Sequence, residues 1–159
     1  MTDRATARPA SAADIPELER LYHLLASEME ALRPVWPLTD GLAHPVAATL
    51  GDMLQDRAWT VLLGQLDEVP VGFLAWCDES MLPQAGGDRI AAVRFLFTEP
   101  EARRVGIGEA MITLFLQQAT AAGFHRFDAH VSPGHREAKN FFEANGFTAR
   151  SIVMYRQGE

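Results

Sequence analysis

A strand, a loop with two glycines and a long apolar helix follow one another between residues 89 and 122, and this succession constrains the fold most. The stretch RIAAVRFLFTEP is rich in β-branched and aromatic residues and stops at Pro100, which is typical of a buried strand. From residue 107 to residue 122 apolar side chains recur at helical spacing. Gly106 and Gly108 stand where this helix begins. Because the first N–H groups of a helix have no intrahelical partner and glycine leaves them unshielded, we predict that a phosphate binds there.

Further strands and helices are predicted on both sides of this unit. Two apolar runs separated by a short charged turn predict a β-hairpin, and an alternating run after the long helix predicts another strand. The expected strands are 6–11, 58–66, 70–79, 89–100, 125–131 and 147–157, and the expected helices are 11–32, 46–56, 107–122 and 134–146. Residues 33–45 carry three prolines and a glycine and are predicted to be a loop. An antiparallel meander followed by a strand–helix–strand crossover implies a mixed sheet covered by helices.

Length and composition favour one ordinary globular domain over residues 1–159. Apolar residues make up 48% of the chain, which is enough for a core of its own, and the formal net charge of −7 argues against a nucleic-acid partner. The single cysteine, Cys77, excludes an internal disulfide and suits a reducing compartment. No apolar run is long enough for a membrane span, and the first ten residues do not resemble a signal peptide. We therefore expect a cytoplasmic protein without a membrane partner.

The glycine pair alone leaves several interpretations open. A dinucleotide-binding fingerprint requires a third glycine, but Met111 stands in that position, and the preceding strand ends several residues too early. The lysine of a phosphate-binding Walker loop is absent. Gly106 and Gly108 also fit a tight turn in which they only relieve steric crowding. The positive charge of Arg103 and Arg104 beside the helix start favours a pyrophosphate ligand.

Two motifs on either side of this point carry a resemblance to a known family. Arg103-x-x-Gly106-x-Gly108, after the segment TEPEA, resembles the acyl-CoA-binding motif of the GCN5-related N-acetyltransferases, the GNAT superfamily. HREAKNFFEANGF, from residue 135 to residue 147, is similar to the family's next motif, N-x-x-A-x-x-F-Y-x-x-x-G-F. The resemblance implies an α/β (α+β) fold with a mixed, mostly antiparallel sheet of six to seven strands and about four helices. It also implies a bulge in the fourth strand, which is expected to splay from the fifth.

The resemblance further implies that acetyl-CoA is the cosubstrate. Its pantetheine arm would lie along the fourth strand and its pyrophosphate on the amides from Arg104 to Glu109, while His135 replaces an asparagine that is common in the family. The implied cofactor-binding residues are Leu96, Phe97, Thr98, Arg103, Arg104, Val105, Gly106, Ile107, Gly108, Glu109, His135 and Phe142. No metal is expected, since the spacing of five residues places His125 and His130 on opposite faces of a strand.

The catalytic groups depart from the family pattern. The tyrosine that often protonates the leaving thiolate falls at Phe142, so Tyr155 or Tyr22 is a weak candidate for the acid, and solvent is a further alternative. The fourth-strand carboxylate falls at Ala92. His130 on the fifth strand is then the candidate general base, because histidine titrates near neutrality. Two other interpretations stay open, namely Asp128 as a weaker candidate for the base and His130 as an ordinary surface residue.

These observations predict an enzyme that transfers an acetyl group from acetyl-CoA to a primary amine by direct attack. The amine belongs to a small molecule or a peptide, and the sequence does not say which. The alternative is a catalytically degenerate domain that binds acyl-CoA or a protein partner without transfer, which Phe142 and Ala92 favour. Trp36, in the loop after the first helix, is a candidate wall of the acceptor site or a local packing anchor. The family resemblance also makes a homodimer an expectation.

Overall fold

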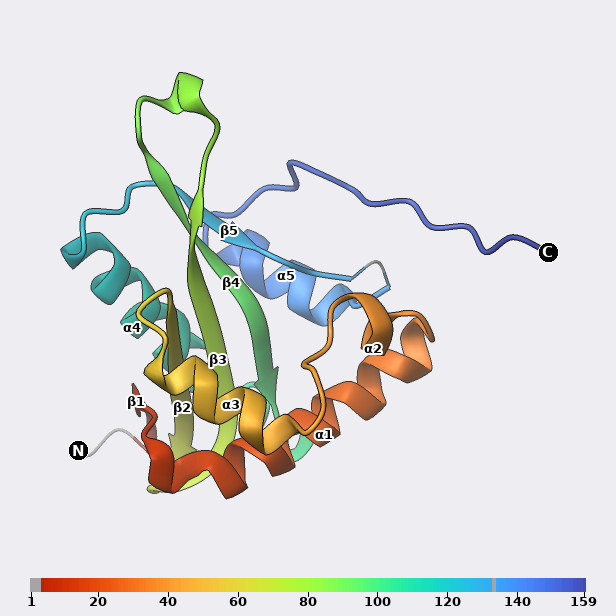
Figure 1. Ribbon diagram of the computed structural model, residues 1–159. Coiled ribbons are helices and arrows are strands. Elements are labelled where there is room, and N and C mark those ends of the chain that lie inside the picture. Colours follow the sequence, from red (N-terminus) through yellow and green to blue (C-terminus); the bar gives the residue numbers. More distant parts are fainter. Residues whose placement is uncertain (1–3, 133) are drawn as a thin grey trace.

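The computed structural model describes residues 4–132 and 134–159, and five strands in this part of the chain form one sheet in the order β1-β2-β3-β4-β5 (Figure 1). Neighbouring strands from β1 to β4 are antiparallel, whereas β4 and β5 are parallel. The strand bounds are β1 Ala5–Pro9, β2 Trp59–Leu66, β3 Val69–Ser80, β4 Arg89–Thr98 and β5 Phe127–Ala129. The predicted fold class, a mixed and mostly antiparallel sheet flanked by helices, is confirmed.

Helices cover both faces of this sheet and divide the core into two layers (Figure 1). Their bounds are α1 Ile15–Leu32, α2 Trp36–Thr39, α3 Val46–Gln55, α4 Ile107–Ala121 and α5 Arg136–Ala144. Successive strand residues point to opposite faces. Leu63 and Phe73 therefore pack under α1 and α3, whereas their neighbours Leu62 and Leu74 pack under α4. All four side chains are almost completely buried, as expected for strands that are covered on both faces.

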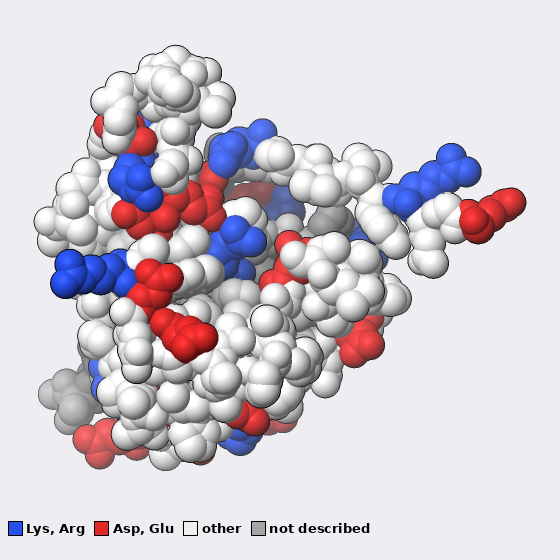
Figure 2. All heavy atoms as spheres, viewed as in Figure 1, with Lys and Arg blue, Asp and Glu red and all other residues white. Residues whose placement is uncertain are grey.

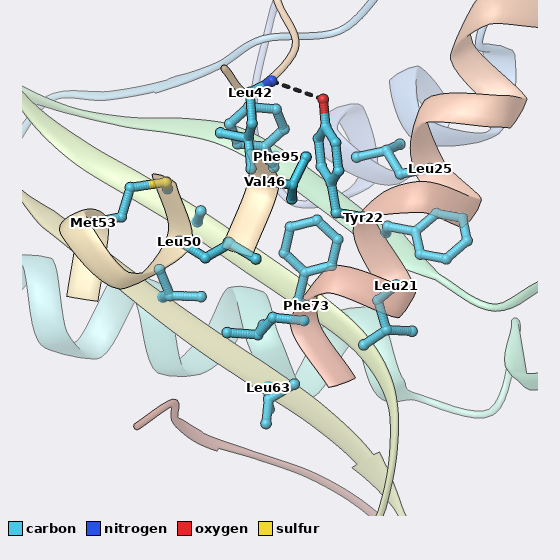
Figure 3. Close-up of a cluster of buried hydrophobic side chains, with 14 of the residues drawn as sticks. Leu21, Tyr22, Leu25, Leu42, Val46, Leu50, Met53, Leu63, Phe73 and Phe95 are labelled. Atoms are coloured by element: carbon cyan, nitrogen blue, oxygen red, sulfur yellow. Dashed lines mark hydrogen bonds between the residues drawn. The ribbon is translucent and has the colours of Figure 1, made fainter. Parts of the chain in front are cut away.

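The loop after α1 is fixed to the core by a buried tyrosine (Figure 3). Tyr22 is 3% exposed, and its hydroxyl oxygen accepts a hydrogen bond of 2.7 Å from the backbone N–H of Leu42. Its ring packs against Trp36 and Phe95. Burial raises the pKa of the Tyr22 hydroxyl, which makes it a poorer acid. Trp36 belongs to the same cluster and is 7% exposed. Of the two roles predicted for it, this burial fits the packing anchor.

Two facing glycines let α4 approach the sheet closely. Gly64 of β2 and Gly72 of β3 are paired in register under the first turns of α4. A Cβ atom on Gly64 would lie 2.6 Å from the Ile107 side chain, and one on Gly72 would lie 2.6 Å from the carbonyl oxygen of Phe97. Because any larger residue would collide there, Gly64 allows α4 to lie close to the sheet and Gly72 leaves room for the backbone of β4.

An extra residue in β4 produces the bulge that the family resemblance implied. Ala75 of β3 pairs with Phe95 and Trp76 pairs with Val93, so Arg94 is left between two paired residues. The bulge reverses the alternation of β4. Ala91 and Val93 face α4 before it, whereas Phe95 and Phe97 face α1 and α3 after it.

The parallel contact between β4 and β5 ends where the bulge begins. It consists of three residue pairs, from Ala91–Phe127 to Val93–Ala129, followed by one hydrogen bond of 2.9 Å from the N–H of His130 to the carbonyl oxygen of Val93. Beyond this point no described residue of β5 pairs with β4. The splay between the fourth and fifth strands is therefore confirmed.

The C-terminal segment differs from the sequence prediction. The described residues form five strands rather than six to seven, and the predicted strand 147–157 is absent. Residues 147–159, which we call the tail, have no regular secondary structure; Phe147 packs against Phe142 and Arg150 binds Asp128, and beyond them the chain runs away from the body (Figure 1). The side chains of this segment favour a strand, but a strand forms only where a neighbouring strand pairs with its backbone. β5 is also shorter than the predicted range 125–131, and α2 lies inside the predicted loop 33–45.

We predict that Tyr22→Phe lowers the free energy of unfolding by about 1–3 kcal/mol, because the buried N–H of Leu42 loses its acceptor. Denaturant unfolding would measure the loss. Tyr155→Phe is the matched control, since Tyr155 is 61% exposed and should tolerate the change. Equal stability of the two variants would contradict the structural role assigned to the Tyr22 hydroxyl.

Candidate active site

The parting of β4 and β5 leaves a groove of about 370 Å³, which we call the β4–α5 groove. One wall is the end of β4, the other is α5, and the loop before α4 closes one end. Nine of the twelve sequence-predicted cofactor residues line it: Leu96, Phe97, Thr98, Arg103, Arg104, Gly106, Gly108, Glu109 and His135. Ala102, Glu137, Ala138, Asn140 and Phe141 complete the lining. Residues predicted from two separate motifs are thus brought together in one site.

Three predicted cofactor residues lie elsewhere. Phe142 is 4% exposed and packs against Phe147 in the core, while its neighbour Phe141 lines the groove. Adjacent helical residues point about 100° apart, so a family motif with two aromatic residues does not say which of them faces a ligand. Ile107 is the first residue of α4, and its side chain is buried in the core. The side chain of Val105 is exposed and does not line the groove.

The loop before α4 has the backbone shape that the two glycines suggested. Gly106 is the N-cap residue of α4 with φ of 96°, a left-handed conformation that glycine adopts without strain. Arg104 is also left-handed, with φ of 66°, which is uncommon for a residue with a side chain. A Cβ on Gly108 would approach the Phe141 ring to 3.1 Å. The first amides of α4 therefore face a groove that no side chain at residue 106 or residue 108 obstructs.

Arg103 lines the groove as predicted, and its side chain is also held by several groups of the protein. Its Nε donates to the carbonyl oxygen of Thr98 at 2.8 Å, and its terminal nitrogens pair with Glu28 at 2.8 Å and Glu137 at 3.2 Å. The guanidinium also lies 5.6 Å from the Phe97 ring centre. Arg103 therefore joins β4, α1 and α5 around the groove.

Arg104 is the available cation of the pair. It is exposed, and within residues 4–132 and 134–159 it takes part in no hydrogen bond or ion pair. His135, like Arg103, is already engaged by the protein, because its Nε2 lies 3.2 Å from Glu28 and its side chain is only 15% exposed. Glu28 thus holds two groove residues at once, a role that nothing in the sequence pattern of α1 indicated.

A second group of polar residues lies where the two strands part, on the face of the sheet that carries α1 and α3. We call Glu79, Arg94, Asp128 and His130 the polar cluster. Arg94 of the bulge pairs with Glu79 at 3.0 Å, and the Arg150 guanidinium binds the buried carboxylate of Asp128 with one contact at 2.7 Å. Figure 2 shows that this face is hollowed near its centre and carries side chains of both charges around the hollow.

The environment of His130 lowers its pKa from the ordinary value of 6.5. Partial desolvation of the ring is the largest cause, even though the residue as a whole is exposed, and the positive charge of Arg94 acts in the same direction. The charges of Glu79, Asp128 and Asp40 oppose the shift without cancelling it. His130 is therefore neutral at pH 7 and able to accept a proton.

The other candidate groups are not available at this site. Tyr155 lies on the exposed tail, and its hydroxyl contacts Gln157 at 3.5 Å. The carboxylate of Asp128 is held by Arg150. Cys77 is buried, and burial together with the negative charge of Glu79 raises the pKa of its thiol to about 12, which makes it a poor nucleophile.

A larger cleft of about 620 Å³ lies at the opposite end of α4. It is lined by Trp76, Gln118 and residues around the β3–β4 turn, and it contains none of the sequence-predicted site residues. Size alone therefore does not identify the site, whereas the convergence of the two motifs on the β4–α5 groove does.

The acetyltransferase (GNAT) family model matches residues 18–147, which include the groove, the loop before α4 and the polar cluster. The chain belongs to the GNAT family. No helix in the described part of this GNAT chain is long and apolar enough to cross a membrane.

Among related sequences, an uncharacterized N-acetyltransferase of Methanocaldococcus jannaschii is 29% identical over 84 residues, which are 53% of this chain and 37% of that protein. The chain thus matches little more than a third of the length of this curated relative.

Two solved structures show the same fold. A ribosomal-protein-alanine N-acetyltransferase from Brucella melitensis biovar Abortus 2308 has a TM-score of 0.71 and 22% identity, covering 97% of this chain and 99% of its own. An aminoglycoside N-acetyltransferase in complex with CoA has a TM-score of 0.72 and 18% identity, covering 99% and 97%.

We predict that Arg103→Ala lowers the free energy of unfolding by about 1–3 kcal/mol, because charge-assisted hydrogen bonds to Glu28 and Glu137 are lost at a partly buried position. Arg104→Ala is the control and should change stability by no more than about 0.5 kcal/mol, as exposed substitutions usually do. Chemical unfolding of both variants checks this, and a larger loss at Arg104 would reverse the two assignments.

Proposed function

We propose that this GNAT chain transfers an acetyl group from acetyl-CoA to a primary amine. The observation that carries the proposal is the β4–α5 groove, in which the glycine loop at the start of α4, the end of β4 and helix α5 meet beyond the last β4–β5 residue pair. A pyrophosphate would bind the amides of residues 104–109 together with the Arg104 side chain. The pantetheine arm would then follow Leu96, Phe97 and Thr98 toward the point where the strands part.

The groups at the strand parting suit direct attack by the amine on the thioester. His130 is neutral and would accept the proton that the amine loses, either directly or through water. The amine nitrogen forms a bond to the carbonyl carbon, and backbone N–H groups of β4 beyond the bulge would stabilise the charge on the oxygen. The carbon–sulfur bond then breaks. The CoA thiolate takes a proton from solvent, since no tyrosine lines the groove.

The acceptor is an amine of a small molecule or a peptide. The solved relatives named above are described as acting on a ribosomal protein's alanine and on an aminoglycoside, so related folds accommodate both kinds of acceptor. We infer a cytoplasmic location from the single buried thiol and the expected acetyl-CoA supply.

A thiol-release assay with acetyl-CoA and a panel of primary amines tests the proposal. We expect release of CoA thiol that depends on both substrates, and acetylated amine as the product. Thermal stabilisation by CoA but not by NADH would separate this activity from dinucleotide binding. Stabilisation by NADH alone would overturn the assignment of the donor site.

A second candidate function is acyl-CoA binding without transfer. Two observations favour it: Ala92 stands where related enzymes often carry a carboxylate, and the buried Phe142 stands at the usual tyrosine position. CoA binding with no acetyl transfer to any amine, peptides included, would establish this alternative.

We predict that Gly106→Glu abolishes CoA binding, because it places bulk and negative charge where the pyrophosphate must approach. Gly123→Glu is a matched control. Gly123 has φ of 98° at the opposite end of α4, so it suffers the same backbone strain away from the groove. Calorimetric titration with CoA should show binding by the control variant only. Normal CoA affinity in folded Gly106→Glu protein would contradict the predicted phosphate site.

We predict that the acidic limb of kcat/KM lies below pH 6.5, because the His130 pKa is lowered. Arg94→Met should move this limb to higher pH, since it removes a positive charge that lowers the pKa and leaves Glu79, whose charge raises it. His130→Ala should remove the limb and slow the reaction by about 10²–10⁴-fold. A pH–rate profile of His130→Ala that is identical to wild type would exclude His130 as the base.

A further inference from the structure

The cleft of about 620 Å³ at the far end of α4, which we call the far cleft, contains two polar groups that the protein leaves unpaired. Within residues 4–132 and 134–159, the Trp76 Nε1 and Gln118 Oε1 atoms are buried and have no hydrogen-bond partner, and both residues line the cleft. Trp76 as a whole is 6% exposed. Because buried polar groups in folded proteins are nearly always hydrogen-bonded, an unpaired donor and an unpaired acceptor in one cleft favour a ligand that partners both.

The two unpaired groups lie on adjoining elements, β3 and α4. The Trp76 ring packs edge-on against Phe115 and Phe124, with ring centres 5.3 Å and 5.9 Å away. Gln118 follows Phe115 by three residues, so their side chains are neighbours on the surface of α4. The indole N–H can only donate a hydrogen bond, and the Gln118 carbonyl oxygen can only accept one. A ligand that binds both therefore needs a carbonyl oxygen beside an N–H, which is the arrangement in a secondary amide.

The charges around the far cleft favour an anionic ligand. Both carboxylates of the lining already have an arginine partner: Asp78 pairs with Arg89. Asp88 pairs with Arg126 at 3.4 Å. Arg57, which also lines the cleft, is exposed and takes part in no ion pair or hydrogen bond with any described residue. A carboxylate on the ligand would therefore give Arg57 a partner, whereas a cation would find its natural partners occupied.

We propose that the far cleft binds an acylamino carboxylate, the group present in an N-acylated amino acid and in the last residue of a peptide. Its amide carbonyl would accept the hydrogen bond of the Trp76 indole, its N–H would donate to Gln118, and its carboxylate would lie toward Arg57. Phe124 and Ala122 in the lining suit an apolar side chain on the ligand. Both unpaired atoms are covered in the structure, so the Gln118 side chain, which is only partly buried, turns aside as the ligand enters.

Calorimetric titration with N-acetylphenylalanine tests the ligand class. We expect saturable binding that persists when CoA is present, because the far cleft shares no lining residue with the β4–α5 groove. N-acetylphenylalanine amide, which lacks the carboxylate, and phenylalanine, which lacks the secondary amide, should both bind more weakly. A peptide that ends in phenylalanine distinguishes the two sources. If it binds more tightly than N-acetylphenylalanine, the cleft takes peptide ends, and if it binds more weakly, the cleft takes free acylated amino acids.

Variants of the two unpaired residues test where the ligand binds. Gln118→Leu should fold, because the buried oxygen that it removes has no partner, and it should weaken binding about twofold to tenfold, as expected for one hydrogen bond. Gln117→Leu is the matched control, since Gln117 is exposed and does not line the cleft. Trp76→Phe should weaken binding by a similar factor. Its control is Trp59→Phe, because Trp59 packs in the other layer of the core.

Arg57→Gln tests the position of the carboxylate. It should weaken binding of N-acetylphenylalanine about twofold to fivefold, as expected for an exposed charge pair. Binding of N-acetylphenylalanine amide should not change, because that ligand has no carboxylate for Arg57 to contact. Circular dichroism confirms that each variant is folded.

Four results would overturn the proposal. The first is that neither N-acetylphenylalanine nor the peptide binds. The second is binding that CoA abolishes, because the ligand would then occupy the β4–α5 groove. The third is binding that is unchanged in Gln118→Leu or in Trp76→Phe. The fourth is that the amide or phenylalanine binds as tightly as N-acetylphenylalanine, or that Arg57→Gln affects both acetylated ligands equally. None of these titrations contains an acetyl donor, so their outcome does not depend on the proposed activity.

Discussion

Arg94, the extra residue in β4, is the constraint on which the two halves of the site depend. Without the bulge, Arg94 would pair in register, the alternation of β4 would continue, and Phe95 and Phe97 would fall on the same face of the sheet as Val93. With it, the strand bends away from β5 and opens the β4–α5 groove, while the guanidinium of Arg94 stays beside Glu79 and His130. The bulge at Arg94 thus lies between the groove proposed for acetyl-CoA and the polar cluster, to which Arg94 contributes a positive charge.

In the proposed function, an anion in the groove would be held mainly by backbone groups. Arg103 already pairs with Glu28, Glu137 and the Thr98 carbonyl, so the attraction would come from the amides of α4 and from Arg104. Arg104 adopts its left-handed conformation at some energetic cost. Fixed dipoles of this kind need no rearrangement when a ligand arrives, and the network around Arg103 keeps them in place.

The sequence predicted best what depends on local pattern and on motif spacing. Strand β4, the glycine turn and helix α4 were predictable because periodicity, proline and glycine all act within a few residues. Phe142 was placed wrongly because a helix of nine residues has two aromatic neighbours and the motif does not state its rotation. The ion pair of Arg103 with Glu28 was not predictable, because the two residues lie 75 positions apart in the sequence. The prediction of a final strand was wrong for a related reason. Residues 147–157 have side chains that favour strands, but local sequence does not indicate whether a neighbouring strand is present to pair with them.

Gly64 and Gly72 restrict which substitutions this protein can accept in evolution. Neither residue is among those that line the groove or form the polar cluster, yet Gly64 lies under the first turn of α4 and Gly72 lies against the groove residues Phe97 and Thr98. A methyl group on Gly64 would push against the start of α4, and one on Gly72 would push against the end of β4, so both walls of the groove depend on residues that do not line it. Such positions should be as intolerant of substitution as a catalytic side chain, although neither has a side chain at all.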